Sequence, residues 1–311
     1  MKKIIAASIL GLSTFAYAQV NAIVSVLPQK TFVEAIGGDK VNVSLMVKPG
    51  NSPHSYEPKP SQMKDISKAD IYFAMGVEFE DAWLDKFKNQ NKNMEIVHLD
   101  EGIVKIKMAA HSHDEDHKGE HNEHKEHGHH DHDEDHKDHE KHADHDEHKH
   151  EGFDPHVWTS PSNVKIIAQN IYNELIAHDK ANASYYKANY EKFLTYIKDT
   201  DKQIKTILLD IETGSKFMVF HPAWGYFAKD YGLTQLAIEA GGKNPKPKQV
   251  MHLIEEAKEE GVKAVFTAPE FSEKVANQIA KEVGVPVIKV SPLNPKWSQN
   301  LQNLAKAIAN K

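Results

Sequence analysis

The chain has 311 residues, no cysteine and a formal net charge of −7. The absence of cysteine excludes a disulfide framework, a thiolate metal site and a cysteine that carries a lipid anchor. The charge is unevenly distributed, because residues 111–150 carry 5 − 15 = −10 and the remainder carries 33 − 30 = +3. No basic segment dominates, so we do not expect a nucleic-acid partner.

The first 18 residues have the pattern of a secretory signal peptide. Two lysines follow Met1, residues 4–15 form an apolar run, and an Ala-Tyr-Ala sequence ends at Ala18. This order predicts cleavage after Ala18 and export of a mature chain that begins at Gln19. The apolar run is shorter than the roughly 20 residues of a membrane-spanning helix. We therefore expect a soluble periplasmic protein rather than one held by a membrane anchor.

Short β-branched runs alternate with helical patterns from residue 22 onward. The first set of predicted strands covers residues 22–27, 41–47, 70–74 and 95–99, and a predicted helix at 161–177 follows. The second set covers residues 216–220, 233–239, 264–267 and 285–290. Alternation of this kind predicts βαβ units and a parallel sheet in each half of the chain.

The helix between the last two predicted strands is well marked in the sequence. Ser272 can cap its N-terminus, and Gly284 stands where a helix would close. Val275, Ile279 and Val283 form an apolar stripe at helical spacing, which predicts the buried face.

The longest helical pattern covers residues 183–213, which contain neither glycine nor proline. Its apolar residues fall on one stripe at spacings of mostly three and four: Tyr186, Tyr190, Phe193, Ile197, Ile204, Leu208 and Ile211. About thirty residues in a helix would be roughly 45 Å long, enough to bridge two domains. We expect an α/β fold with an N-terminal lobe at 19–181, a linking helix at 182–213 and a C-terminal lobe at 214–311.

The segment 111–150 contains 15 of the 21 histidines, together with 15 acidic residues and 5 lysines. Its histidines are His111, His113, His117, His121, His124, His127, His129, His130, His132, His136, His139, His142, His145, His148 and His150. Imidazole and carboxylate are ligands of borderline divalent cations such as Zn²⁺, so this His-rich tract indicates a transition-metal protein. The tract lacks the apolar residues that a core needs, and we expect it to be a disordered insertion without metal.

Three other histidines lie at or near the ends of predicted strands. His54 is in the loop after the second strand, His156 follows the His-rich tract, and His221 comes directly after residues 216–220. Ligands of open α/β sheets bind outside the carboxyl ends of the strands, so these three are candidate metal ligands. The remaining histidines outside the tract lack this placement and are interpreted as solvated: His98, His178 and His252.

Three motifs make the chain recognisable from residue 22 to the C-terminus. They are Pro-His-x-Tyr-Glu-Pro at 53–58, Asp-Pro-His-x-Trp at 154–158 and Phe-His-x-Ala-x-Gly-Tyr-Phe at 220–227. Together they resemble the zinc-binding, solute-binding subunit of bacterial zinc ABC importers, in cluster A-I of the solute-binding proteins. The resemblance implies two lobes around a rigid helix, and a metal in the cleft bound by His54, His156 and His221. It also implies an inner-membrane ABC permease as the partner.

One position departs from the pattern of many relatives, which have Asp-Pro-Leu after the last strand. Here the sequence is Ser291-Pro292-Leu293. A serine hydroxyl is a poor ligand for a divalent metal, so the fourth position is open to water or to another carboxylate. Glu270, past the preceding strand, is the first candidate, and the alternative is a loop carboxylate that faces solvent.

We therefore expect capture of periplasmic Zn²⁺ and its delivery to the permease by a monomeric protein that is not an enzyme. Three neutral imidazoles suit tetrahedral zinc, whereas manganese prefers more carboxylate ligands. Two alternatives within metal binding are a carrier of manganese or another divalent cation and a His-rich periplasmic metal buffer. A zinc hydrolase or lyase is a third alternative, but no His-Glu-x-x-His motif or evident general base accompanies the histidines.

Overall fold

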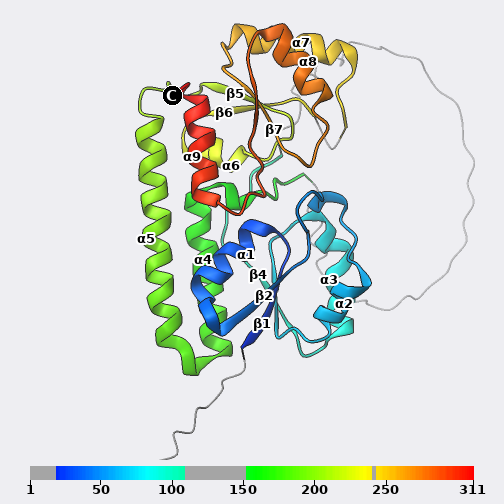
Figure 1. Cartoon of the computed structure of the whole chain (residues 1–311), viewed down its shortest axis with the longest axis vertical. Coiled ribbons are helices and arrows are strands. Elements are labelled where there is room, and N and C mark those ends of the chain that lie inside the picture. The colour runs from blue at the N-terminus through cyan, green and yellow to red at the C-terminus, as the bar shows by residue number, and fades with distance from the viewer. Residues whose placement is uncertain (1–18, 109–151, 240–242) are drawn as a thin grey trace, which may run out of the picture. The chain divides into compact units, whose positions relative to one another are not determined.

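The structure, a computed structural model, describes residues 19–108, 152–239 and 243–311 (Figure 1). The predicted signal peptide with its cleavage position, and all fifteen histidines of the His-rich tract, lie outside these described residues. The described residues of Met1–Glu101 and Val164–Asp199 form one compact unit, here unit 1. Those of Gly102–Asn163 and Thr200–Lys311 form the other, unit 2.

Unit 1 contains a four-stranded parallel sheet in the order β2-β1-β3-β4. The strands are β1 (Val20–Val24), β2 (Val41–Leu45), β3 (Ile71–Ala74) and β4 (Glu95–His98). Helices α1 (Leu27–Gly37), α2 (Pro60–Ile66) and α3 (Glu78–Gln90) connect them, with short 3₁₀ turns η1 (Gly38–Lys40) and η2 (Pro53–Ser55). Figure 1 shows α1 on one side of the sheet and α2 with α3 on the other. Every residue of β3 is buried, as expected of a strand covered on both faces.

Unit 2 repeats this arrangement with a parallel sheet in the order β6-β5-β7-β8. The strands are β5 (Lys216–Val219), β6 (Thr234–Ala237), β7 (Val265–Thr267) and β8 (Val287–Lys289). The helices are α6 (Gly225–Asp230), α7 (Pro247–Glu259), α8 (Lys274–Val283) and α9 (Trp297–Ile308), with a 3₁₀ turn η3 (Val157–Thr159). All eight predicted strands are thus confirmed, and so is the prediction of two parallel α/β sheets.

Helix α8 follows its predicted pattern except at its start. Ile279 is fully buried, Val283 packs against the core of unit 2, and Gly284 ends the helix in the left-handed conformation at φ 81°. The N-cap residue is Glu273 rather than Ser272. The Ser272 hydroxyl instead accepts the backbone N–H of Lys274 at 3.5 Å, so it still satisfies one donor of the first turn.

Two long helices contribute residues to both units. They are α4 (Pro161–His178) and α5 (Ala183–Ile207), joined by the 3₁₀ turn η4 (Lys180–Asn182). Helix α5 has 25 residues and ends six residues before the predicted Thr213. The backbone N–H of Ile211 donates to the carbonyl of Leu208 at 3.0 Å, which is the tighter spacing of a 3₁₀ turn. The chain therefore leaves the α-helical conformation before β5 begins. No helix in the described part of the chain combines the length and apolar content needed to cross a bilayer.

Candidate metal centre

His221 is held by a carboxylate at the edge of the unit 2 sheet. It lies two residues beyond β5, and Glu239 lies two residues beyond the neighbouring parallel strand β6. The carboxyl ends of the two strands meet at one edge, and this brings His221 Nδ1 to 2.6 Å from Glu239 Oε1. Both side chains are buried. An ionised carboxylate only accepts hydrogen bonds, so Nδ1 donates and the lone pair of the imidazole is on Nε2.

His156 has the same arrangement, built from the Asp-Pro-His sequence. Oδ1 of Asp154 accepts the backbone N–H of His156 at 2.9 Å and its Nδ1–H at 2.8 Å. Both residues are 1% exposed, and the next turn is fixed by Trp158, whose Nε1 donates to the carbonyl of Pro292 at 2.8 Å. This imidazole therefore also carries its lone pair on Nε2.

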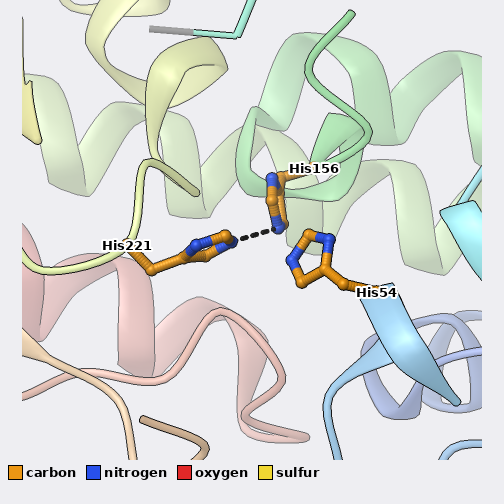
Figure 2. Close-up of side chains that lie close together, drawn as sticks. All are labelled: His54, His156 and His221. Atoms are coloured by element: carbon orange, nitrogen blue, oxygen red, sulfur yellow. Dashed lines mark hydrogen bonds between the residues drawn. The ribbon is translucent and has the colours of Figure 1, made fainter. Parts of the chain in front are cut away.

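The two imidazoles of unit 2 face each other through these Nε2 atoms. The Nε2 atoms of His156 and His221 are 3.3 Å apart, as the dashed line in Figure 2 marks. Two lone pairs at this distance repel unless a proton or a metal cation lies between them. Phe271 stacks on the ring of His221 with a centroid distance of 4.5 Å, which restricts its rotation. The pair can therefore bind a cation that prefers imidazole nitrogen.

His54 belongs to unit 1 and has its own carboxylate. Its 3₁₀ turn is capped by the hydroxyl of Ser52, which accepts the His54 backbone N–H at 3.3 Å. Its Nδ1 is 2.7 Å from Oε1 of Glu78, the first residue of α3. Tyr56 of the same motif donates to Gln62 Oε1 at 2.7 Å and thereby attaches the loop to α2. All three candidate histidines thus pair Nδ1 with a carboxylate.

A second carboxylate, Glu80, fixes the start of the helix that carries Glu78. Glu80 is buried, and its oxygens accept the backbone N–H groups of Met75 and Gly76 at 2.8–3.1 Å and the hydroxyl of Ser25. Burial raises the pKa of Glu80 to about 7, although these hydrogen bonds oppose the shift. The turn from β3 into α3 is therefore held by an acid that loses its proton near neutral pH.

Glu270, the candidate fourth ligand, contacts the residue that replaces the aspartate of relatives. The hydroxyl of Ser291 donates to Glu270 Oε1 and Oε2 at 3.1 and 3.2 Å. Among the described residues, Glu270 is not part of any group of three potential ligand atoms within 4.8 Å of one another. The structure therefore places Glu270 beside Ser291, and His156 beside His221.

Sequence reasoning missed the three carboxylates that orient the histidines. Asp154 lies in the Asp-Pro-His-x-Trp motif, two residues before His156, and could have been found from that spacing. Glu239 was the last residue of a predicted strand and could have been found by pairing the ends of neighbouring strands. Glu78 had no such signal, because it is one of three acids in the first turn of α3 and only the fold selects it.

Residues 23–311 match the family described as zinc-uptake complex component A, periplasmic. The chain is 31% identical over 285 residues to the zinc-binding protein AdcA of Streptococcus pyogenes serotype M3, covering 89% of this chain and 51% of that protein. It therefore spans about half the length of this relative.

Two further relatives match over most of both chains. One is the high-affinity zinc uptake system protein ZnuA of Bacillus subtilis, 29% identical over 271 residues, with 86% of this chain and 76% of that protein covered. The other is a crystal structure of ZnuA with a TM-score of 0.78 and 35% identity, with 94% and 98% covered. On this sequence match and this shared two-sheet fold, the chain belongs to the family of the periplasmic component A of zinc-uptake complexes.

Proposed function

We propose that the protein captures Zn²⁺ in the periplasm and delivers it to a membrane ABC permease. The observation that carries the proposal is the His156–His221 pair. Each Nδ1 is hydrogen-bonded to a buried carboxylate, and the two Nε2 atoms face each other. A carboxylate on the second ring nitrogen fixes the tautomer and makes the imidazole a stronger zinc ligand. Zinc is also named in both curated relatives.

We propose His54, His156 and His221 as the ligands of one Zn²⁺, each through Nε2. His54 is included because its Nδ1 is hydrogen-bonded to a carboxylate, that of Glu78, as in the other two histidines. We also propose lobes at residues 19–181 and 214–311 with a linking helix at 182–213, so that His54 and His156 come from the first lobe and His221 from the second.

The fourth position is left to water or to Glu270. The Ser291 hydroxyl donates to both Glu270 oxygens, so coordination by Glu270 would require this contact to change. Glu270→Gln distinguishes the two ligands. It lowers zinc affinity if Glu270 coordinates, and it leaves the affinity unchanged if water does.

The ligand set supports zinc over the alternatives. Three imidazoles without a coordinating carboxylate favour tetrahedral Zn²⁺, whereas a manganese carrier would present more oxygen ligands. A His-rich buffer would need no oriented pair of histidines. The Asp154 and Glu239 carboxylates are bonded to imidazole, which is the role of an orienting group and not of a general base. We therefore propose a monomeric transport protein without catalytic activity, exported by the signal peptide of residues 1–18.

Replacing His221 by alanine tests the proposal. In a variant that lacks residues 111–150, zinc should raise the melting temperature, because ligand that binds only the folded state adds about 2.7 kcal/mol at 100 times its Kd. His221→Ala should fold but lose most of this rise. His252→Ala, an exposed histidine on α7, is the control and should keep it. A full zinc-dependent rise in His221→Ala would show that the site is assigned wrongly.

A further inference from the structure

Asp154, the carboxylate that orients His156, is hydrogen-bonded through only one of its oxygens. Its Oδ1 accepts both the backbone N–H and the Nδ1–H of His156. Its Oδ2 is buried and has no hydrogen-bond partner among the described residues. Because the donors that the structure shows at this carboxylate belong to His156 itself, the position of the carboxylate depends on where the backbone of Asp154 lies.

The backbone of Asp154 belongs to a short antiparallel ribbon formed by residues 106–108 and 152–154. The N–H of Asp154 donates to the carbonyl of Ile106 at 2.9 Å, and an antiparallel bridge pairs the middle residues of the two segments. A ribbon of two strands is at best marginally stable by itself in water. It therefore needs a contact with the rest of unit 2 to keep Asp154 in place.

Tyr226, the second residue of α6, supplies such a contact through its hydroxyl. The hydroxyl donates to the carbonyl of Asp154 at 2.9 Å and accepts the backbone N–H of Ile106 at 3.3 Å. One oxygen thus bonds to both strands of the ribbon, at the pair of residues that the 2.9 Å backbone hydrogen bond joins. Tyr226 is buried, so the hydroxyl makes these bonds away from solvent.

We propose that Tyr226 is a positioning residue of the metal centre, which acts on His156 through the backbone and the carboxylate of Asp154. The proposal rests on the proposed function, because it takes His156 to be a zinc ligand. Tyr226 lies five residues after His221, so the segment that carries one histidine of the pair also holds the other one in place. Without the hydroxyl, the His156 ring would be less well fixed, and so would the 3.3 Å separation of the two Nε2 atoms.

Tyr226→Phe tests the proposal, because it removes the hydroxyl and keeps the buried ring. Tyr231→Phe is the matched control. The Tyr231 hydroxyl, directly after α6, donates to Oδ1 of Asp201 on α5 at 3.1 Å. Both variants therefore remove a tyrosine hydroxyl that forms hydrogen bonds within unit 2, but only Tyr226→Phe removes one from the ribbon.

The first measurement is the NMR signal of the His156 imidazole in the full, metal-free chain. Its Nδ1–H is buried and bonded to Asp154, so this proton should exchange slowly with water and give a separate signal, which His156→Ala assigns. We expect severalfold faster exchange and a smaller downfield shift in Tyr226→Phe, and wild-type behaviour in Tyr231→Phe. An unchanged signal in Tyr226→Phe would overturn the proposal.

The second measurement is the zinc affinity of the tight site, from competition between the full chain and a chromophoric zinc chelator. Tyr226→Phe should raise the Kd severalfold, by less than the about 10–100-fold that loss of an orienting carboxylate costs. Adding Tyr226→Phe to Asp154→Ala should lower the affinity little further, because the two act on His156 by one route.

Equal zinc affinity of wild type and Tyr226→Phe at a tight site would also overturn the proposal. A different outcome separates it from the proposed function. If wild type retained no tightly bound zinc while Tyr226→Phe changed the His156 signal, the proposed function would fail, and the control of His156 by Tyr226 would be supported.

Discussion

A Cβ atom on Gly225 would lie 2.6 Å from Oδ2 of Asp154. The backbone at the start of α6 and the carboxylate that orients His156 therefore occupy adjoining space, and only a residue without a side chain fits between them. The glycine of the third sequence motif thus has a steric role at the candidate metal centre, although it contributes no ligand.

Gly225→Ala should weaken zinc binding by displacing Asp154 from His156. Loss of an orienting carboxylate costs about 10–100-fold in metal affinity, and we expect an increase in Kd within that range. The measurement is calorimetry on the variant that lacks residues 111–150. If Gly225→Ala acts by displacing Asp154, adding it to Asp154→Ala should lower the zinc affinity little further. Fully additive losses of zinc affinity would show that the two substitutions act independently.

Glu239→Gln should have a comparable effect at the second histidine of the pair. The amide can still accept from His221 Nδ1 but carries no charge, so the imidazole becomes a weaker donor to the metal. We expect Kd for zinc to rise roughly tenfold while the melting temperature of the metal-free protein changes little. Glu255→Gln, on an exposed position of α7, is the matched control. Equal zinc affinity in both variants would refute an orienting role for Glu239.

Deletion of residues 111–150 should separate tight from weak zinc binding. By composition this segment has almost no apolar residues to form a core, so we expect its binding to cost chain entropy, whereas the histidine pair is already positioned by hydrogen bonds. Calorimetry should show one tight site in both forms, and several weaker ones only in the full chain. If deletion of residues 111–150 also removed the tight site, the tight site would lie in the tract and not at the histidine pair.

The stability of the metal-free protein should fall as pH rises from about 4.5 to 7. Burial raises the pKa of Glu80 to about 7, so the folded protein holds this proton to higher pH than the unfolded chain does. The stabilisation is complete below about pH 4.5 and is lost as pH rises through 7.

Glu80→Gln should reduce this fall by at most on the order of 3 kcal/mol. Some of the fall should remain, because the pKa of Glu174 is raised to about 7 as well. Urea unfolding at pH 4.5, 6 and 7.5 measures the free energy of unfolding. If its dependence on pH were the same in wild type and Glu80→Gln, Glu80 would ionise normally.

The sequence predicted the strands well because each carries a local signal. All eight runs of β-branched residues became strands, with ends that shifted by at most three residues. The long helix was overestimated, since its apolar stripe continues through Leu208 and Ile211 after the backbone has turned. An apolar stripe in the sequence predicts which side chains are buried. It does not predict whether the backbone between them stays helical.

The candidate ligands were predictable because each histidine lies beside a strand end or in a distinctive motif. Their carboxylates were harder to find, since the pairing of His221 with Glu239 depends on β5 and β6 being neighbours in the sheet. His178 was interpreted as solvated, and its side chain is exposed in the structure.

The facing Nε2 atoms of His156 and His221 have a consequence for transport. Their lone pairs repel at 3.3 Å, and a cation bound to both nitrogens replaces this repulsion by attraction. If the protein carries Zn²⁺ as we propose, the pair without metal has a higher energy than the pair that holds the ion. The geometry that favours capture would therefore oppose release, so a receiving site would have to bind the ion more tightly than the pair does.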